Sequence, residues 1–140
     1  MFPPAEVSSK CHLSFIISHS PADDSRYLFN VAYGVGKAGC DRMAADCGHE
    51  LRKSGVAMSS LWPGPVKTEY ITDKMTGDNP MAKIFEKGET IEFAGIVLAH
   101  LAAESGETIM ARSGRIINTA DVARQYGFKD TNGTVPMDFR

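Results

Sequence analysis

Short apolar runs alternate with longer amphipathic stretches along most of the chain. Residues 13–17 are apolar and β-forming, and serine, proline and aspartate follow them, which predicts a buried strand and then a turn. Residues 56–62 have the same character and stop abruptly at Pro63-Gly64-Pro65. Residues 114–119 form a third such run. We therefore expect three short strands.

The longest amphipathic stretch extends from about residue 30 to residue 54. Asn30 is suited to be its N-cap, and Gly55 to be the residue just past its C-terminal end. Its early part contains several small residues, which would allow another group to approach that face closely. An apolar stripe is predicted from a spacing of four residues: Met43, Cys47 and Leu51.

The remaining elements complete an alternating pattern. Residues 67–80 are polar and contain glycine, which predicts a long loop or a broken helix. Residues 91–103 have apolar positions at helical spacing, and residues 121–126 form a short helix. Strand, helix, strand, loop, helix and strand in this order predict right-handed crossovers. The expected fold class is α/β, a parallel sheet of about three strands with flanking helices.

Composition limits the choice of partners. The 140 residues are 43% hydrophobic and 23% charged, with a net charge of −2, which suits one core and gives no basic surface for nucleic acid. Three cysteines without C-x-x-C spacing predict neither a disulfide framework nor a zinc site. No stretch approaches the roughly 18 apolar residues of a membrane span, and no signal peptide is recognisable. We expect a cytoplasmic protein with no membrane span.

Tyr33 and Lys37 are the residues with the clearest chemical use. Four residues apart near the start of a helix, they share one face. A tyrosine pKa is near 10, and a neighbouring ammonium together with the positive end of a helix favours the tyrosinate. Such a tyrosine can act as a general acid or base. The Y-x-x-x-K pattern alone is weak, because any helix with an exposed tyrosine and lysine can show it by chance.

The order of three features makes the pattern more specific. Ser20 follows a strand, Tyr33 and Lys37 open a long helix, and Pro63-Gly64 ends the next strand. This order resembles the short-chain dehydrogenase/reductase family, and the resemblance covers roughly residues 13 to 130. The stretch 27–41 is particularly similar to the branch known as family member one, and two further stretches continue the likeness: residues 61–64 and 121–127.

The resemblance implies a reaction in which a carbonyl and an alcohol are interconverted with NAD or NADP. It implies that Tyr33 exchanges a proton with the substrate oxygen and that Ser20 holds the same oxygen by a hydrogen bond. Lys37 would bind the nicotinamide ribose and lower the tyrosine pKa. The substrate would be a small carbonyl or alcohol compound, and the stretch 67–80 would be a mobile lid.

The resemblance also implies a cofactor contact after the second strand. Pro63 and Gly64 would form the turn, and Val66 and Thr68 would contact the nicotinamide carboxamide through backbone and hydroxyl respectively. Simpler readings remain open: Ser18 or Ser25 could be the true match for Ser20, and Thr68 could merely cap a turn. The histidines have no metal-ligand spacing, so no metal site is expected.

The chain departs from the family pattern in its first residues. No glycine precedes Gly34, whereas the family holds the pyrophosphate with a glycine-rich turn. A full doubly wound sheet needs on the order of 200 residues. We expect the C-terminal part of a Rossmann-like sheet over residues 13–130, preceded by a lead-in at 1–12 and followed by a polar tail at 131–140, with cofactor binding impaired.

A second function is therefore kept open, an inactive remnant that acts as an oligomerisation module. In the family the Tyr-Lys helix packs against its counterpart in a partner subunit, so a homo-oligomer through this helix is expected. The face expected to form that contact consists of small residues: Ala44, Ala45 and Gly48.

Overall fold

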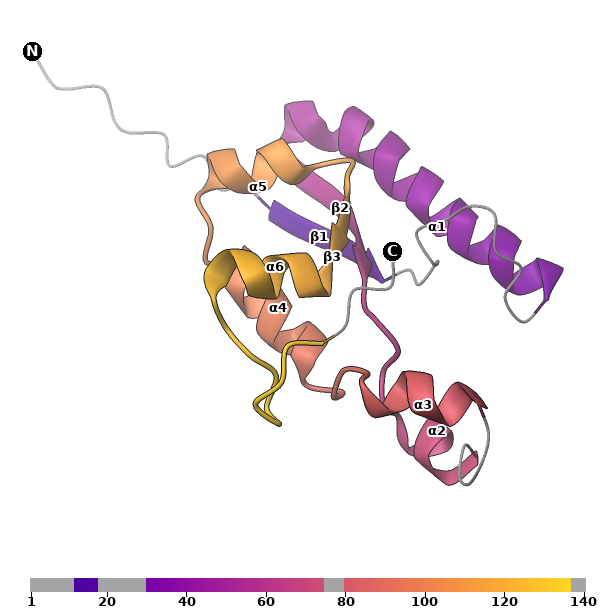
Figure 1. Ribbon diagram of the computed structural model, residues 1–140. Coiled ribbons are helices and arrows are strands. Elements are labelled where there is room, and N and C mark those ends of the chain that lie inside the picture. The colour runs from indigo at the N-terminus through magenta and orange to yellow at the C-terminus, as the bar shows by residue number, and fades with distance from the viewer. Residues whose placement is uncertain (1–11, 18–29, 75–79, 137–140) are drawn as a thin grey trace, which may run out of the picture.

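A computed structural model of the chain describes residues 12–17, 30–74 and 80–136. Three parallel strands lie in the order β1 (His12–Ile17), β2 (Val56–Trp62) and β3 (Ile116–Asn118). Helices pack against the sheet, and the long helix α1 (Val31–Glu50) runs along one side of it in Figure 1. The predicted parallel three-stranded sheet with flanking helices is confirmed. The division at residues 12 and 130 stays a prediction.

Strand register brings the carboxyl ends of the three strands to one edge of the sheet. Ile17 at the end of β1 pairs with Leu61, and Trp62 at the end of β2 pairs with Asn118 at the end of β3. All three strands therefore end at nearly the same level. In open parallel sheets this carboxyl edge is where ligands bind.

One face of the sheet carries the apolar core. Side chains alternate between the faces of a strand, and Leu61 and Ile117 point to the side covered by α4 (Phe93–Ala102) and α6 (Thr119–Tyr126). Burial of such apolar side chains stabilises a fold by about 25 cal/mol per Å² of apolar surface removed from water. Its buried members are Leu61, Phe93, Val97, Leu101, Ile117, Val122 and Ala123.

The other face packs closely against α1. Ala44 and Gly48 are the buried residues of this helix, whereas Met43 is 49% and Leu51 is 37% exposed. A Cβ on Gly48 would lie 2.4 Å from the backbone nitrogen of Gly114, so the helix and the chain before β3 are almost in backbone contact. The predicted stripe of Met43, Cys47 and Leu51 is therefore wrong, because only small residues fit where the helix meets the sheet.

The helix boundaries largely follow the sequence signals. Asn30 caps α1, and after the 3-10 turn η1 (Leu51–Ser54) Gly55 adopts the left-handed conformation with φ 71°. The predicted strand at 114–119 is shorter, since Gly114 has φ 82° and Asn118 already caps α6. The predicted long loop contains α2 (Glu69–Lys74) and leads to α3 (Pro80–Glu86).

Helix α5 (Gly106–Arg112) was not predicted, although a local signal exists. The Ser105 hydroxyl accepts a hydrogen bond from the Thr108 N–H at 3.2 Å, as an N-cap does. With only seven residues, the helix offers too few turns for an apolar period to be recognised. It connects α4 to β3 and brings Arg112 back toward the end of α4.

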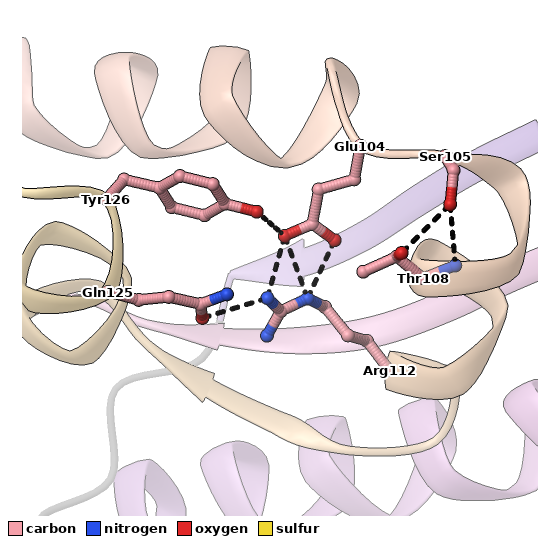
Figure 2. A network of polar contacts seen from close by, with 6 residues as sticks. All are labelled: Glu104, Ser105, Thr108, Arg112, Gln125 and Tyr126. Atoms are coloured by element: carbon pink, nitrogen blue, oxygen red, sulfur yellow. Dashed lines mark hydrogen bonds and ion pairs between the residues drawn. The ribbon is translucent and has the colours of Figure 1, made fainter.

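A polar network lies where α4 ends and joins this end to α5 and α6 (Figure 2). The Glu104 side chain is only 3% exposed and accepts two hydrogen bonds in fork geometry from Arg112, at 2.7 and 2.8 Å. The Tyr126 hydroxyl donates to the same carboxylate, and Arg112 also donates to Gln125 at 3.0 Å. Burial opposes ionisation, but the Arg112 and Tyr126 hydrogen bonds outweigh it, and the pKa of Glu104 is lowered. The network fixes α5 and α6 to the end of α4.

Candidate active site

The cap of α1 fixes where the predicted catalytic helix begins. Asn30 is extended, and its side-chain oxygen accepts the Tyr33 N–H at 2.8 Å. The Gly34 N–H already donates to the Asn30 carbonyl at 3.2 Å. Tyr33 and Lys37 therefore lie in the first two turns, as the sequence predicts.

Tyr33 and Lys37 are brought together on one face of α1. The Lys37 ammonium lies over the Tyr33 ring, 5.7 Å from its centroid, and both residues are half-buried. This distance is within the range of a cation–π interaction. Burial raises the pKa of Tyr33 above its usual value near 10, which is opposite to the direction expected from a neighbouring ammonium alone. In this chain Tyr33 is therefore a neutral phenol at neutral pH.

Asp41 sets the position of this pair relative to the sheet. One of its carboxylate oxygens accepts hydrogen bonds from the Ser60 hydroxyl at 2.5 Å and from the Trp62 indole N–H at 2.8 Å. Helix α1 runs antiparallel to β2, because its later residue Gly48 lies by Met58. Lys37 is one turn, about 6 Å, earlier along the helix than Asp41. Hence Lys37, and Tyr33 one turn further, extend past the end of β2. Figure 1 shows that the N-terminal half of α1 reaches beyond the sheet.

The Pro63-Gly64 turn starts at this same edge. Its Gly64 N–H donates to the Glu89 carboxylate at 2.7 Å, and both residues are buried. Sequence reasoning missed Glu89, because a single glutamate in a polar stretch has no distinguishing spacing. Its partners become visible only when the chain is folded.

Val66 is held by a parallel bridge to Glu89. The bridge uses the Pro65 carbonyl and the Lys67 N–H, each at 2.8 Å from a backbone atom of Glu89. Because peptide groups alternate in direction along an extended segment, the N–H and C=O of Val66 face away from Glu89. The Val66 carbonyl accepts the Thr68 N–H at 2.9 Å.

Thr68 caps the short helix α2. Its hydroxyl accepts the Ile71 N–H at 3.3 Å, and its carbonyl accepts the Thr72 hydroxyl at 2.8 Å. The capping role considered for Thr68 is thus confirmed, and its predicted contact with a cofactor stays a prediction.

Ser20, with its alternatives Ser18 and Ser25, lies outside the described residues. Strand β1 ends at Ile17, three residues before Ser20 along the chain. The role of this serine therefore stays a prediction.

The surfaces of α1 differ from those expected for an interface. Ala44 and Gly48 face the chain's own sheet, and the backbone of Ala45 lies beside Gly114. Ala44 and Gly48 fill the helix–sheet contact and are therefore not available for a subunit contact, whereas Ala45 is partly exposed and its role at an interface stays a prediction. In contrast, a Cβ at Gly34, Gly36 or Gly39 would meet nothing within 4 Å.

Residues 12–17, 30–74 and 80–136 hold no cluster of three or more histidine, cysteine, aspartate or glutamate side chains that could bind a metal ion. None of the described helices is both long and apolar enough to cross a membrane.

Comparison with known proteins now places the chain. No family model matches it. Human (Homo sapiens) dehydrogenase/reductase SDR family member 1 is 40% identical over 132 residues, which are 89% of this chain and 42% of the human protein. The chain belongs to the short-chain dehydrogenase/reductase family. It spans about two fifths of the curated relatives that it matches.

Solved structures agree on the fold of this short-chain dehydrogenase/reductase chain. An Agrobacterium tumefaciens protein assigned as a 2-deoxy-d-gluconate 3-dehydrogenase, with NADP bound, matches with a TM-score of 0.60 and 16% identity over 79% of this chain and 45% of its own. A 7α-hydroxysteroid dehydrogenase in complex with NADH and 7-oxo glycochenodeoxycholic acid matches with a TM-score of 0.56 and 14% identity over 94% of this chain and 48% of its own. The Rossmann-like fold predicted from the sequence is confirmed.

Proposed function

We propose that the chain carries the proton-transfer site of an NAD- or NADP-dependent oxidoreductase that interconverts a carbonyl and an alcohol on a small-molecule substrate. The observation that carries the proposal is the pairing of Tyr33 with Lys37, whose ammonium lies 5.7 Å from the ring centroid at the carboxyl edge of the sheet. Membership of the family and the NADP and NADH bound to structural neighbours support it.

Tyr33 acts as the general acid in the reducing direction and as the general base in the oxidising direction. Its phenol donates its proton to the substrate oxygen as that oxygen gains negative charge. Bound NADH or NADPH supplies the hydride. Ser20 donates a hydrogen bond to the same oxygen and holds it near the phenol. Tyr33 is protonated at neutral pH, as the general acid of the reducing direction must be.

Lys37 has two roles. Its ammonium donates hydrogen bonds to the hydroxyls of the nicotinamide ribose, and its charge stabilises the tyrosinate left after proton transfer. The donor set fits the cofactor, since a charged amine and a phenol converge on one helix face. Open space beside Gly34 and Gly36 leaves room on the neighbouring surface of α1.

The turn after β2 receives the nicotinamide end. Pro63 and Gly64 redirect the chain, and the Val66 peptide groups, which face away from Glu89, contact the carboxamide. Thr68 takes part through its hydroxyl. The helix cap uses that hydroxyl as an acceptor, so its own proton can be donated to a ligand.

The test combines cofactor titration with paired variants. The purified chain is titrated with NADH and with NADPH, and turnover is followed on a panel of aldehydes, ketones and secondary alcohols. Tyr33→Phe should abolish turnover with cofactor affinity nearly unchanged, whereas Lys37→Ala should weaken both. The exposed Lys53 provides a control variant, Lys53→Ala. Wild-type turnover in Tyr33→Phe, or no binding of either nucleotide at millimolar concentration, would contradict the proposal.

A second candidate is a homo-oligomerisation module without turnover. It is favoured by exposed apolar residues on α1, where Val31 is 70%, Val35 is 67% and Met43 is 49% exposed. Such side chains usually mark a contact surface when they gather on one face. Sedimentation of the wild-type chain and of Val35→Glu tests this candidate. Self-association that the variant abolishes, with no nucleotide binding by the wild-type chain, would favour the module.

A further inference from the structure

Glu89 is a completely buried acidic residue that neither the sequence pattern nor the proposed proton transfer uses. It lies between α3 and α4 and is 0% exposed. Glutamate is almost never fully buried unless it is paired, so its presence here needs a reason. Among the described residues no positively charged side chain forms an ion pair with it.

The backbone around Glu89 is fixed against the segment that follows the Pro-Gly turn. The Glu89 N–H donates to the Pro65 carbonyl at 2.8 Å, and the Lys67 N–H donates to the Glu89 carbonyl at the same distance. A Cβ on Gly88 would lie 2.2 Å from the Pro65 carbonyl oxygen, so glycine is required for this approach. The side chain of residue 89 is thereby directed under the turn.

The Glu89 carboxyl then joins two strand ends. Its Oε1 accepts the Gly64 N–H at 2.7 Å and is hydrogen-bonded to the Thr119 hydroxyl at the start of α6. The same hydroxyl lies 3.3 Å from the Trp62 carbonyl oxygen. A Cβ on Gly64 would approach Oε1 to 3.1 Å, which leaves little space for any other residue. One carboxyl oxygen therefore connects the Gly64 N–H of the turn to the Thr119 hydroxyl at the start of α6.

The second oxygen is the unusual feature. Oε2 is buried and has no hydrogen-bond partner among the described residues. Burial raises the pKa of Glu89, the hydrogen bonds from Thr119 and Gly64 lower it, and nearby Asp130 raises it again. Oε1 is the acceptor in both of its hydrogen bonds, from the Gly64 N–H and from the Thr119 hydroxyl, so the carboxyl meets this part of the fold through one oxygen alone. An apolar side chain in this place would leave the buried Gly64 N–H without its acceptor.

We propose that Glu89 is a positioning residue. Its carboxyl accepts the Gly64 N–H and so keeps the Val66 peptide groups pointing toward the nicotinamide end of the cofactor. This inference rests on the proposed function, in which the turn receives that end. Glu89 does not touch the cofactor. Its effect passes through the geometry of residues 64–66.

The test uses Glu89→Gln, which keeps an acceptor oxygen, and Glu89→Met, which keeps the volume and removes it. Hydrogen exchange of the Gly64 amide is followed by NMR, and affinity for NADH and NADPH is measured by titration. Glu89→Met should speed Gly64 exchange and weaken nucleotide binding by at least about tenfold, the effect of one lost hydrogen bond at a buried site. Glu89→Gln should leave Gly64 exchange and nucleotide affinity near the wild-type values. Glu92→Gln, at an exposed neighbour, is the matched control.

The outcomes separate the two proposals. Fast Gly64 exchange with wild-type affinity in Glu89→Met would overturn the positioning role and leave the proposed function in place. A wild-type chain that binds neither nucleotide would overturn the proposed function and this inference with it. If Glu89→Met does not fold, Thr119→Val removes one partner of the carboxyl instead. That variant should weaken binding in the same direction, and unchanged affinity would again overturn the role.

Discussion

The close contact between Gly48 of α1 and Gly114 before β3 predicts a large effect from one methyl group. In Gly48→Ala the new Cβ would lie 2.4 Å from the Gly114 nitrogen, 2.6 Å from its Cα and 3.1 Å from the Met58 carbonyl oxygen. All three atoms belong to the backbone and cannot rotate away. The Gly114 N–H also donates to the Met58 carbonyl at 2.7 Å, so a shift would strain that hydrogen bond.

The magnitude follows from two opposing effects. Forcing a methyl group into a filled contact costs about 1–3 kcal/mol, and replacing glycine by alanine inside a helix returns about 1 kcal/mol. The distance to the Gly114 nitrogen is roughly 1 Å below ordinary contact, which places the cost at the upper end. We expect Gly48→Ala to lower the free energy of unfolding by about 2 kcal/mol.

The matched control is Gly39→Ala in the same helix. A Cβ at Gly39 would meet nothing within 4 Å, so only the helix propensity changes. This variant should raise the free energy of unfolding by about 0.5–1 kcal/mol. Urea unfolding followed by the fluorescence of Trp62, the one tryptophan of the chain, measures both variants. Equal stability of the two would refute the close helix–sheet contact.

Three further predictions concern buried polar groups. The pKa of Glu89 is raised in the folded chain, so the free energy of unfolding of the wild type should fall relative to that of Glu89→Gln as pH rises above about 4.3. The slope should be at most about 1.4 kcal/mol per pH unit. A parallel pH dependence in both proteins would contradict this. The pKa of Glu104 is lowered, so its contribution to the free energy of unfolding should be present at neutral pH and be lost as pH falls through its folded-state pKa. Acid unfolding should therefore shift to higher pH in Glu104→Gln than in the wild type. Asp41→Ala leaves the Ser60 hydroxyl and the Trp62 indole N–H without their acceptor and should lower the free energy of unfolding by about 2–4 kcal/mol. Asp41→Asn should be affected less. Unchanged Trp62 emission in Asp41→Ala would count against these two hydrogen bonds.

The elements that the sequence predicts correctly are those specified by neighbouring residues. The strand at 56–62 is fixed by its own apolar run and by Pro63-Gly64, and the start of α1 by Asn30. The Tyr33-Lys37 pair could be found because a spacing of four needs only a helix. Each of these signals lies within a few residues of the structure that it determines.

The features that the sequence does not reveal depend on partners far along the chain. Glu89 meets Gly64 and Thr119, which are 25 and 30 residues away, and Asp41 meets Trp62, 21 residues away. The apolar stripe on α1 was assigned to the wrong face for a related reason. Whether Gly48 or Met43 faces the sheet is decided by how closely the helix approaches β2 and Gly114, and helical spacing contains no information on that distance.

The central claim is that the Tyr33-Lys37 face and the Pro63-Gly64 turn together hold the nicotinamide end of a cofactor. Trp62 immediately precedes the turn, so energy transfer from its indole to bound NADH or NADPH tests this claim most directly. We predict saturable quenching of Trp62 with matching nicotinamide emission, retained in Tyr33→Phe and weakened in Lys37→Ala. A folded wild-type chain whose Trp62 emission responds to neither nucleotide, or a Lys37→Ala variant that binds as the wild type does, would contradict it.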